Sequence, residues 1–220
     1  MRPPEAPAGN GRGRGTWLAV LGPDGSGKST LLGRLEVELE PSFAAIRRYH
    51  LRPHLGRRGS SRGPQPDPHG QPPRGRAVTV VKLTAWWVDY WLGYLLEVRP
   101  ALRRSTLVLF DRYCDDVLVD PRRYRMREPG RFARLLVRTV PRPDTLVVLD
   151  APESVLRERK QEVSVAETVR QRSAYRALAD RTPRAVVIDA GRPPGEVAAE
   201  VASLVRGPRL EEASVAPHHR

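Results

Sequence analysis

A glycine-rich stretch, GPDGSGKST at residues 22–30, contains the residue types best suited to chemistry in this sequence. Residues 22–29 fit the pattern G-x-x-x-x-G-K-[ST], in which glycines let backbone N–H groups converge on phosphate oxygens. In such a loop Lys28 would reach the β and γ phosphates, and the hydroxyl of Ser29 would bind Mg²⁺. A chance glycine turn is the alternative. An apolar run before the loop (16–21) and leucines at helical spacing after it favour the phosphate loop.

A second group of reactive residues is LFDRY at 109–113, where an apolar run ends in Asp111, Arg112 and Tyr113. In open parallel sheets, ligands gather at the carboxyl ends of the strands. A carboxylate there can hold Mg²⁺ through water or accept a hydroxyl proton, and an adjacent guanidinium can clamp a phosphate with two hydrogen bonds. A surface ion pair is the alternative for LFDRY by itself. A phosphate loop in the same sheet favours a functional site.

Short apolar segments alternate with amphipathic ones along the chain. The apolar segments predict strands at 16–21, 43–51, 105–113, 142–152 and 184–190. The amphipathic segments predict helices at 28–40, 78–98, 154–180 and 194–205. This alternation indicates an α/β fold with a central, mostly parallel sheet covered on both faces. We expect disordered tails at 1–15 and 207–220, one domain at 16–206, and a flexible insertion rich in Pro, Gly and Arg at 53–76.

The composition of the 220 residues limits the class of protein. A single cysteine excludes an internal disulfide framework, no apolar run is long enough to span a bilayer, and residues 1–15 lack the apolar centre of a secretory signal. We therefore expect a cytoplasmic protein with no membrane partner. The formal net charge is +13, and about half of this excess lies in 1–15 and 51–76. A basic solubilising segment and an anionic partner both account for that excess.

Four segments together resemble the thymidylate kinase family: GPDGSGKST, LFDRY, RPDTLVVLDAP and AVVIDAGRPPGEVAAEV. The resemblance covers roughly residues 16–206 and is poor between 53 and 80. It implies a P-loop NTPase fold with three layers, α/β/α. It also implies an ATP-dependent kinase that uses Mg²⁺ and transfers a phosphoryl group to a small-molecule acceptor.

The resemblance also implies roles for individual residues. The donor ATP would be bound by Gly22, Asp24, Gly25, Ser26, Gly27, Lys28, Ser29 and Thr30, with Asp189 and Ala190 beside the adenine. The acceptor would be contacted by Asp24, Arg52, Tyr90, Arg112, Tyr113, Arg172 and Tyr175. Mg²⁺ would be held by Ser29 and Asp111, and Lys28, Asp111 and Arg112 would be catalytic. Because position 25 is glycine rather than the catalytic arginine of some family members, that charge would come from Arg157 or Arg159 in the lid.

The sequence departs from the family on the acceptor side. Tyr90 stands where the family has its base-reading arginine, and DDVLVDPRRYR replaces the Gln-containing segment after DRY. A site built for a polar contact to a base can reject an analogue by about 10⁴-fold, so the loss of such groups argues against the usual recognition of thymine. We expect a nucleoside monophosphate or a similar small anionic acceptor. Arg122, Arg123, Arg125 and Arg127 would either replace the missing contacts or form a solvated basic turn.

Two further functions are compatible with these residues. One is a kinase that acts on the hydroxyl of a nucleoside or sugar. The other is a non-catalytic nucleotide-binding regulator that binds nucleic acid through its basic loop; Asp24, Asp111 and Arg112 favour the enzyme over this regulator. On the helix expected at 79–98, four aromatic residues share one face, which would pack in the core, form a homodimer seam or stack on an acceptor ring: Trp87, Tyr90, Trp91 and Tyr94.

Overall fold

A computed structural model describes residues 14–53, 75–126, 130–159 and 165–207 of the chain. Most of the predicted insertion and most of both predicted tails therefore lie outside the described residues. Within the described ranges, no helix combines the length and the apolar character needed to cross a membrane.

Five parallel strands form one sheet, so the sheet is wholly parallel rather than mostly parallel. Their order in space is β2 (Ala45–His50), β3 (Thr106–Asp111), β1 (Trp17–Leu21), β4 (Thr145–Asp150) and β5 (Ala185–Asp189). The central strand β1 is buried along its whole length, as its apolar sequence WLAVL requires. The predicted α/β class with a P-loop NTPase arrangement is confirmed.

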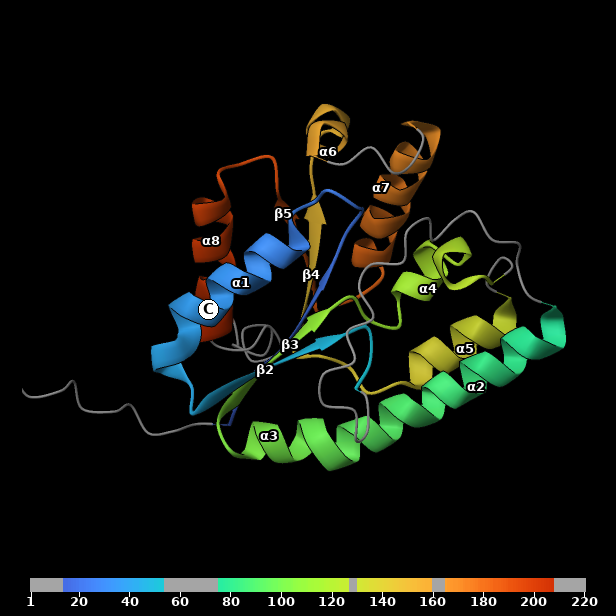
Figure 1. The fold of residues 1–220 in the computed structure, drawn as a ribbon, viewed down its shortest axis with the longest axis horizontal. Helices are drawn as coiled ribbons and strands as arrows, with labels where there is room; N and C mark the ends of the chain where they lie inside the picture. The colour runs from blue at the N-terminus through green and yellow to red at the C-terminus, as the bar shows by residue number, and fades with distance from the viewer. Residues whose placement is uncertain (1–13, 54–74, 127–129, 160–164, 208–220) are drawn as a thin grey trace, which may run out of the picture.

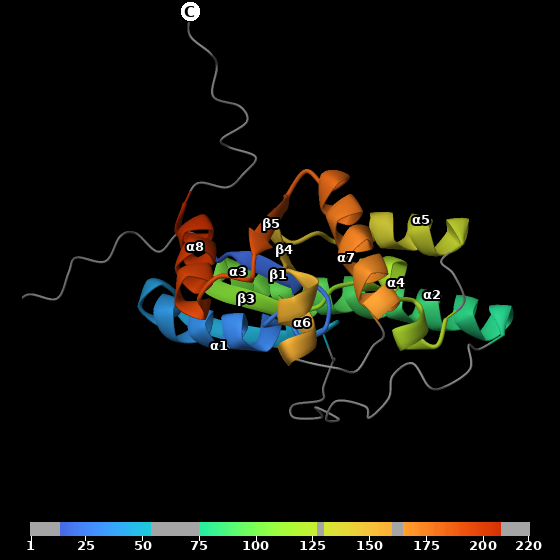
Figure 2. The same cartoon turned by 90° about the horizontal axis from the view of Figure 1, so that it is seen from above.

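Helices cover both faces of this sheet (Figure 1). The helices α1 (Lys28–Leu39) and α8 (Pro194–Arg206) pack against each other and against one face. The other face is covered by α2 (Arg76–Gly93), α3 (Arg99–Arg103) and α7 (Val165–Asp180). Successive residues of β1 point to opposite faces of the sheet. Leu18 and Val20 pack in the core layer with α1 and α8, and Trp17 and Ala19 pack in the core layer on the other face. The helix α5 (Arg131–Thr139) lies beside α2, where both extend past the sheet (Figure 2).

Three helical regions differ from the prediction. The expected helix at 78–98 is α2 followed by a π-helical turn at Tyr94–Val98 and then α3. Pro100, at the start of α3, has no N–H to continue the α-helical ladder, which accounts for the irregular turn before it. Within the expected helix at 154–180 the structure describes two helices, α6 (Glu153–Arg159) and α7, and residues 160–164 lie outside the described residues. The prediction omitted α4 (Asp116–Val119), a 3₁₀ turn at Arg122–Tyr124, and α5.

Candidate functional site: a phosphate loop joined to the end of a neighbouring strand

The glycine-rich stretch forms the connection between β1 and α1. Gly22, Gly25 and Gly27 have φ angles of 146°, 81° and 86°, a region in which L-residues with side chains are strained. A Cβ on Gly22 would lie 2.6 Å from the carbonyl oxygen of Leu149 and 2.8 Å from Oγ of Ser26. The glycines therefore permit a tight turn pressed against β4, with the first turn of α1 following directly after it.

Lys28 begins α1 and folds back over this turn. Its Nζ donates hydrogen bonds to the carbonyl oxygens of Gly22 at 2.8 Å and Pro23 at 2.7 Å. Burial lowers the pKa of Lys28 to about 7, and the positive charge of Arg112 contributes to that shift. Ser29 and Thr30, the next two residues of α1, are exposed. The loop thus combines one buried ammonium group with two accessible hydroxyls.

The end of β3 lies against the same loop. The backbone N–H of Arg112 donates to the carbonyl of Val20 in β1 at 3.0 Å, and Arg112 has a positive φ of 70°. Its Nη2 donates to Oδ1 of Asp24 at 2.6 Å, so the guanidinium reaches the phosphate loop. Burial would raise the pKa of Asp24, but Arg112, Arg123 and Lys28 outweigh it and hold that pKa below its ordinary value.

A buried carboxylate, Asp116, holds the other side of Arg112. Its Oδ2 accepts from Nη1 of Arg112 at 2.7 Å and from the hydroxyl of Tyr124 at 2.5 Å, and its Oδ1 accepts from the hydroxyl of Tyr175. Burial opposes ionisation, but the Arg112 charge and these hydroxyls together lower the pKa of Asp116. The guanidinium of Arg112 is therefore fixed between two carboxylates, Asp24 and Asp116.

Arg123 is the second guanidinium at the loop. Its Nη2 donates to Oδ2 of Asp24, and its Nε donates to Oδ2 of Asp120 at 3.2 Å. Of the four arginines in the basic turn, Arg122 is exposed, Arg125 is half-buried and Arg127 lies outside the described residues. The run of like residues gave no indication of which one would turn inward, so the sequence could not single out Arg123.

Asp111 ends β3 at the edge of the site. Its Oδ2 lies 3.7 Å from Nδ1 of His50 and 3.6 Å from Nη2 of Arg48. Although burial would raise the pKa of Asp111, His50 and the charges of Lys28 and Arg112 lower it, so the group is an ionised carboxylate. Such a carboxylate and the exposed hydroxyl of Ser29 are hard oxygen ligands of the kind that Mg²⁺ takes alongside waters and phosphates.

Several predicted acceptor residues are placed away from this cluster. Tyr113 is 1 % exposed and donates its hydroxyl to the carbonyl of Pro141, so the structure places it in the core rather than at the loop. Tyr90 is also buried, and its hydroxyl donates to the carbonyl of Leu51. Arg52 pairs with Asp89 and lies 5.0 Å from the ring of Trp86. Of the residues predicted only as acceptor contacts, Tyr175 is the one that the described structure joins to Arg112.

The remaining predicted residues lie around the ends of β4 and β5. Arg172 forms two hydrogen bonds with Asp150, at 2.7 and 3.1 Å, and so faces the end of β4. The backbone N–H of Ala190 donates to the carbonyl of Asp150 at 2.6 Å, and Asp189 is exposed beside it. The lid candidates Arg157 and Arg159 belong to α6, but their side chains are outside the described part of the structure.

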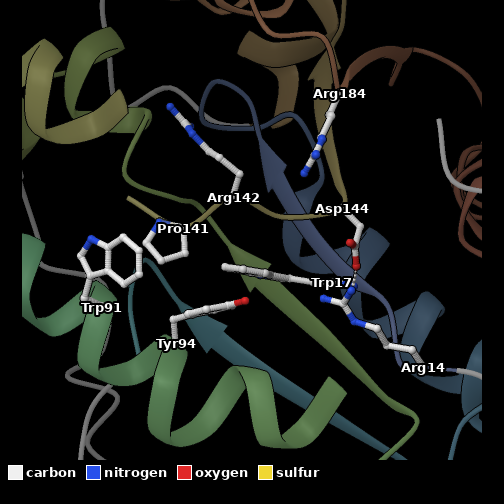
Figure 3. A pocket seen from close by; sticks show the side chains of 8 residues that line it. All are labelled: Arg14, Trp17, Trp91, Tyr94, Pro141, Arg142, Asp144 and Arg184. Atoms are coloured by element: carbon white, nitrogen blue, oxygen red, sulfur yellow. Dashed lines mark hydrogen bonds between the residues drawn. The ribbon is translucent and has the colours of Figure 1, made fainter. Parts of the chain in front are cut away.

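A separate cavity of about 310 Å³ lies at the amino ends of the strands, opposite the end that carries the loop (Figure 3). Trp17 begins β1 there, and Trp91 and Tyr94 of the long helical region complete its aromatic wall. The four strand steps from Trp17 to the loop span roughly 13 Å at the usual rise per residue. Because Tyr94 stacks on Trp17 with ring centroids 5.7 Å apart, these aromatics pack in the core and lie away from the candidate site.

The turn between a buried parallel strand and a helix, with its buried lysine, defines a P-loop nucleotide-binding protein of the α/β class. No family model matches the chain. A probable thymidylate kinase of Pyrobaculum calidifontis is 30% identical over 205 residues, covering 86% of this chain and 95% of that protein. One from Pyrobaculum aerophilum is 29% identical over 206 residues, covering 86% and 96%. A thymidylate kinase of Leifsonia xyli subsp. xyli is 34% identical over 122 residues, or 50% and 58% of the two chains.

The chain belongs to the thymidylate kinase family. It is therefore a nucleotide kinase, and thymidylate kinase is the nearest named activity. The predicted resemblance is confirmed.

Proposed function

We propose that the protein transfers the γ-phosphoryl group of MgATP to a nucleoside monophosphate or a similar small anionic acceptor. The observation that supports this proposal best is the link between the phosphate loop and Arg112 through Asp24. A protein that only bound a nucleotide would need the loop and Lys28. The guanidinium of Arg112, tied to the loop from the neighbouring strand, is a second cation and is the feature that suits an acceptor phosphate.

On the donor side, backbone N–H groups of the turn at 22–27 and the amino end of α1 would bind the phosphates. The ammonium of Lys28 would exchange its carbonyl partners for phosphate oxygens. Ser29 and Asp111 would hold Mg²⁺, which when bound neutralises charge on the transferring phosphoryl group. The adenine would lie near Asp189 and Ala190 at the end of β5. Arg157 and Arg159 remain candidates for further charge neutralisation from α6.

On the acceptor side, Arg112 would hold the phosphate because its guanidinium is fixed before any ligand arrives. Asp24 on one side and Asp116 on the other restrict its rotation, so little conformational entropy is lost on binding. The carboxylate of Asp24 would also face a sugar hydroxyl of the acceptor. Tyr175 would act through Arg112 and Asp116, since its hydroxyl contacts both.

The identity of the acceptor is tested by ADP formation from MgATP with a panel of nucleoside monophosphates, nucleosides and sugar phosphates. We expect turnover with at least one phosphorylated acceptor. Efficient turnover of thymidylate alone would contradict the altered recognition of the base that the sequence predicts. Turnover of nucleosides or sugars alone would favour the alternative, a kinase acting on a hydroxyl.

The donor site is tested by Lys28→Ala, which should abolish ADP release while the protein stays folded. Arg34→Ala is the matched control, because Arg34 is an exposed cation on the same helix. Full activity of Lys28→Ala would exclude the proposed role of the loop.

We also propose a homodimer through the helical region 79–98. The aromatic residues of that region pack inward, but Val88, Leu92, Leu95 and Leu96 are 40–63% exposed. These four lie at helical spacing, so they form one aliphatic stripe. Leu96→Glu should give a monomer by light scattering, whereas Val37→Glu, at another exposed apolar position, should not change the mass. A wild-type monomer would exclude the dimer.

A further inference from the structure

We propose that Arg123 is a second specificity-determining clamp for the acceptor phosphate, acting opposite Arg112. This inference rests on the proposed function and deepens it, because it identifies the phosphate rather than the base as the group that the acceptor site recognises. The residue belongs to the segment that departs most from the family, DDVLVDPRRYR.

The two guanidiniums both contact the carboxylate of Asp24. Arg112 donates to Oδ1 of Asp24 and Arg123 donates to Oδ2 of the same carboxylate. Two guanidiniums that converge on neighbouring oxygens of one carboxylate are also spaced to share neighbouring oxygens of one phosphate. The carboxylate of Asp24 already lies between them, so a phosphate would share the two guanidiniums with Asp24 through their remaining N–H groups.

Arg123 lies on the solvent side of the cluster formed by Arg112, Asp24 and Arg123. The side chains of Arg112 and Asp24 are 6% and 8% exposed, whereas that of Arg123 is 17% exposed. Nε and Nη2 of Arg123 are engaged by Asp120 and Asp24, but no acceptor within the described ranges bonds to its Nη1. An anion entering the site would therefore meet a cation that still has hydrogen-bond donors to offer.

The supporting contacts hold Arg123 in position. The backbone N–H of Arg123 donates to Oδ1 of Asp120 at 3.3 Å, and Gln171 of α7 donates to Oδ2 of the same residue at 3.2 Å. The short 3₁₀ turn that carries Arg123 ends at Tyr124, and Met126, two residues further on, is 2% exposed and packs in a core cluster. Arg123 is thus a preorganised group on a packed turn.

The neighbouring hydroxyls are already engaged. Tyr124 and Tyr175 both donate to Asp116, and the amide of Gln171 donates to Asp120 and Glu167. Consequently these hydroxyl and amide groups hold the carboxylates that position the two arginines, rather than binding the edge of a base. We infer an acceptor that is selected as a phosphate monoester, with weak discrimination among bases.

The test is calorimetric titration of inorganic phosphate into protein saturated with Mg²⁺ and a non-hydrolysable ATP analogue, which occupies the phosphate loop. Arg123→Gln should weaken phosphate binding about 10- to 100-fold, the usual effect of losing charge-assisted hydrogen bonds. Arg123→Lys should recover part of that loss, since it keeps the charge without the fork. Arg122→Gln, at the exposed neighbouring position, should bind phosphate as the wild type does.

Kinetics with an acceptor from the panel provide a second measurement. Arg123→Gln should raise the KM of the phosphorylated acceptor about tenfold or more and leave the KM of ATP within about twofold. If no acceptor turns over, the proposed function fails, but the phosphate titration still decides the role of Arg123.

Three results would overturn the inference. The first is wild-type protein that binds no phosphate under these conditions. The second is Arg123→Gln that binds phosphate as tightly as the wild type. The third is a loss of thermal stability in both Arg123 variants with unchanged phosphate affinity, which would make Arg123 a structural counter-ion of Asp24.

Discussion

Replacement of Asp116 by asparagine tests the buried network that fixes Arg112. Asp116 is fully buried and accepts hydrogen bonds from one guanidinium and two tyrosine hydroxyls. Asparagine has nearly the same shape but carries no charge, and its amide nitrogen cannot accept. Asp116→Asn therefore leaves the buried guanidinium of Arg112 without its inner counter-ion, while Asp24 still neutralises the outer side.

The magnitude follows from the burial of both partners. Removing one member of a buried ion pair costs about 3–5 kcal/mol of unfolding free energy, because the other charge stays desolvated. For a chain of this size each kcal/mol lowers Tm by about 2–4 °C, so we expect a decrease of about 6–20 °C. Tyr124→Phe removes one hydroxyl and leaves the ion pair intact, so its cost should be nearer about 1 kcal/mol.

The assay is thermal and urea unfolding at pH 7, followed by circular dichroism. Asp180→Asn, an exposed position on α7, is the matched control and should unfold as the wild type does. If Asp116→Asn unfolds within about 0.5 kcal/mol of the wild type, the range typical of surface substitutions, the buried ion pair does not exist as described.

Three further results are expected. The pKa of Lys28 falls from 10.5 to about 7 on folding, so between these pH values the unfolded state holds the extra proton. Wild-type stability should therefore rise with pH across this window relative to Lys28→Met, by about 5 kcal/mol in urea unfolding. Gly22→Ala should destabilise the protein by about 1–3 kcal/mol and weaken binding of an ATP analogue, because the alanine Cβ would meet the Leu149 carbonyl at a strained φ. The control Gly33→Ala, which has open space around it on α1, should be neutral or stabilising. The lowered pKa values of Asp24 and Asp116 contribute stability above about pH 4, and this stability should be lost as the pH falls further. Asp116→Asn should lose less stability on acidification than the wild type. Equal losses in the two proteins would contradict those pKa directions.

Local signals predicted most of the fold. An apolar strand, a glycine-rich turn and an amphipathic helix are contiguous in the sequence, so β1, the loop and α1 could be placed without tertiary information. The helix α5 was missed because its arginine-rich sequence buries just two residues, Ala133 and Val137, against its surroundings. The π-helical turn was missed because hydrophobic periodicity does not resolve an interruption of a single turn.

The acceptor side depends on contacts that are distant in sequence. Arg123 and Asp24 are separated by 99 residues, and Tyr175 and Asp116 by 59. No spacing rule connects such positions, and a run of arginines does not show which guanidinium turns inward. Tyr113 was expected at the site because it follows Arg112, but the chain leaves β3 at Arg112, whose φ is 70°, and Tyr113 packs in the same core layer as Phe110.

We propose that this site transfers phosphoryl groups to an acceptor that is itself phosphorylated and held by Arg112. The most direct measurement is the rate of ADP formation from MgATP with thymidylate and the other nucleoside monophosphates, each beside its matching nucleoside. We expect ADP formation with a monophosphate, little ADP formation with its nucleoside, and a large loss of activity in Arg112→Lys. Equal rates with the nucleoside or without any acceptor, or full activity of Arg112→Lys, would contradict it.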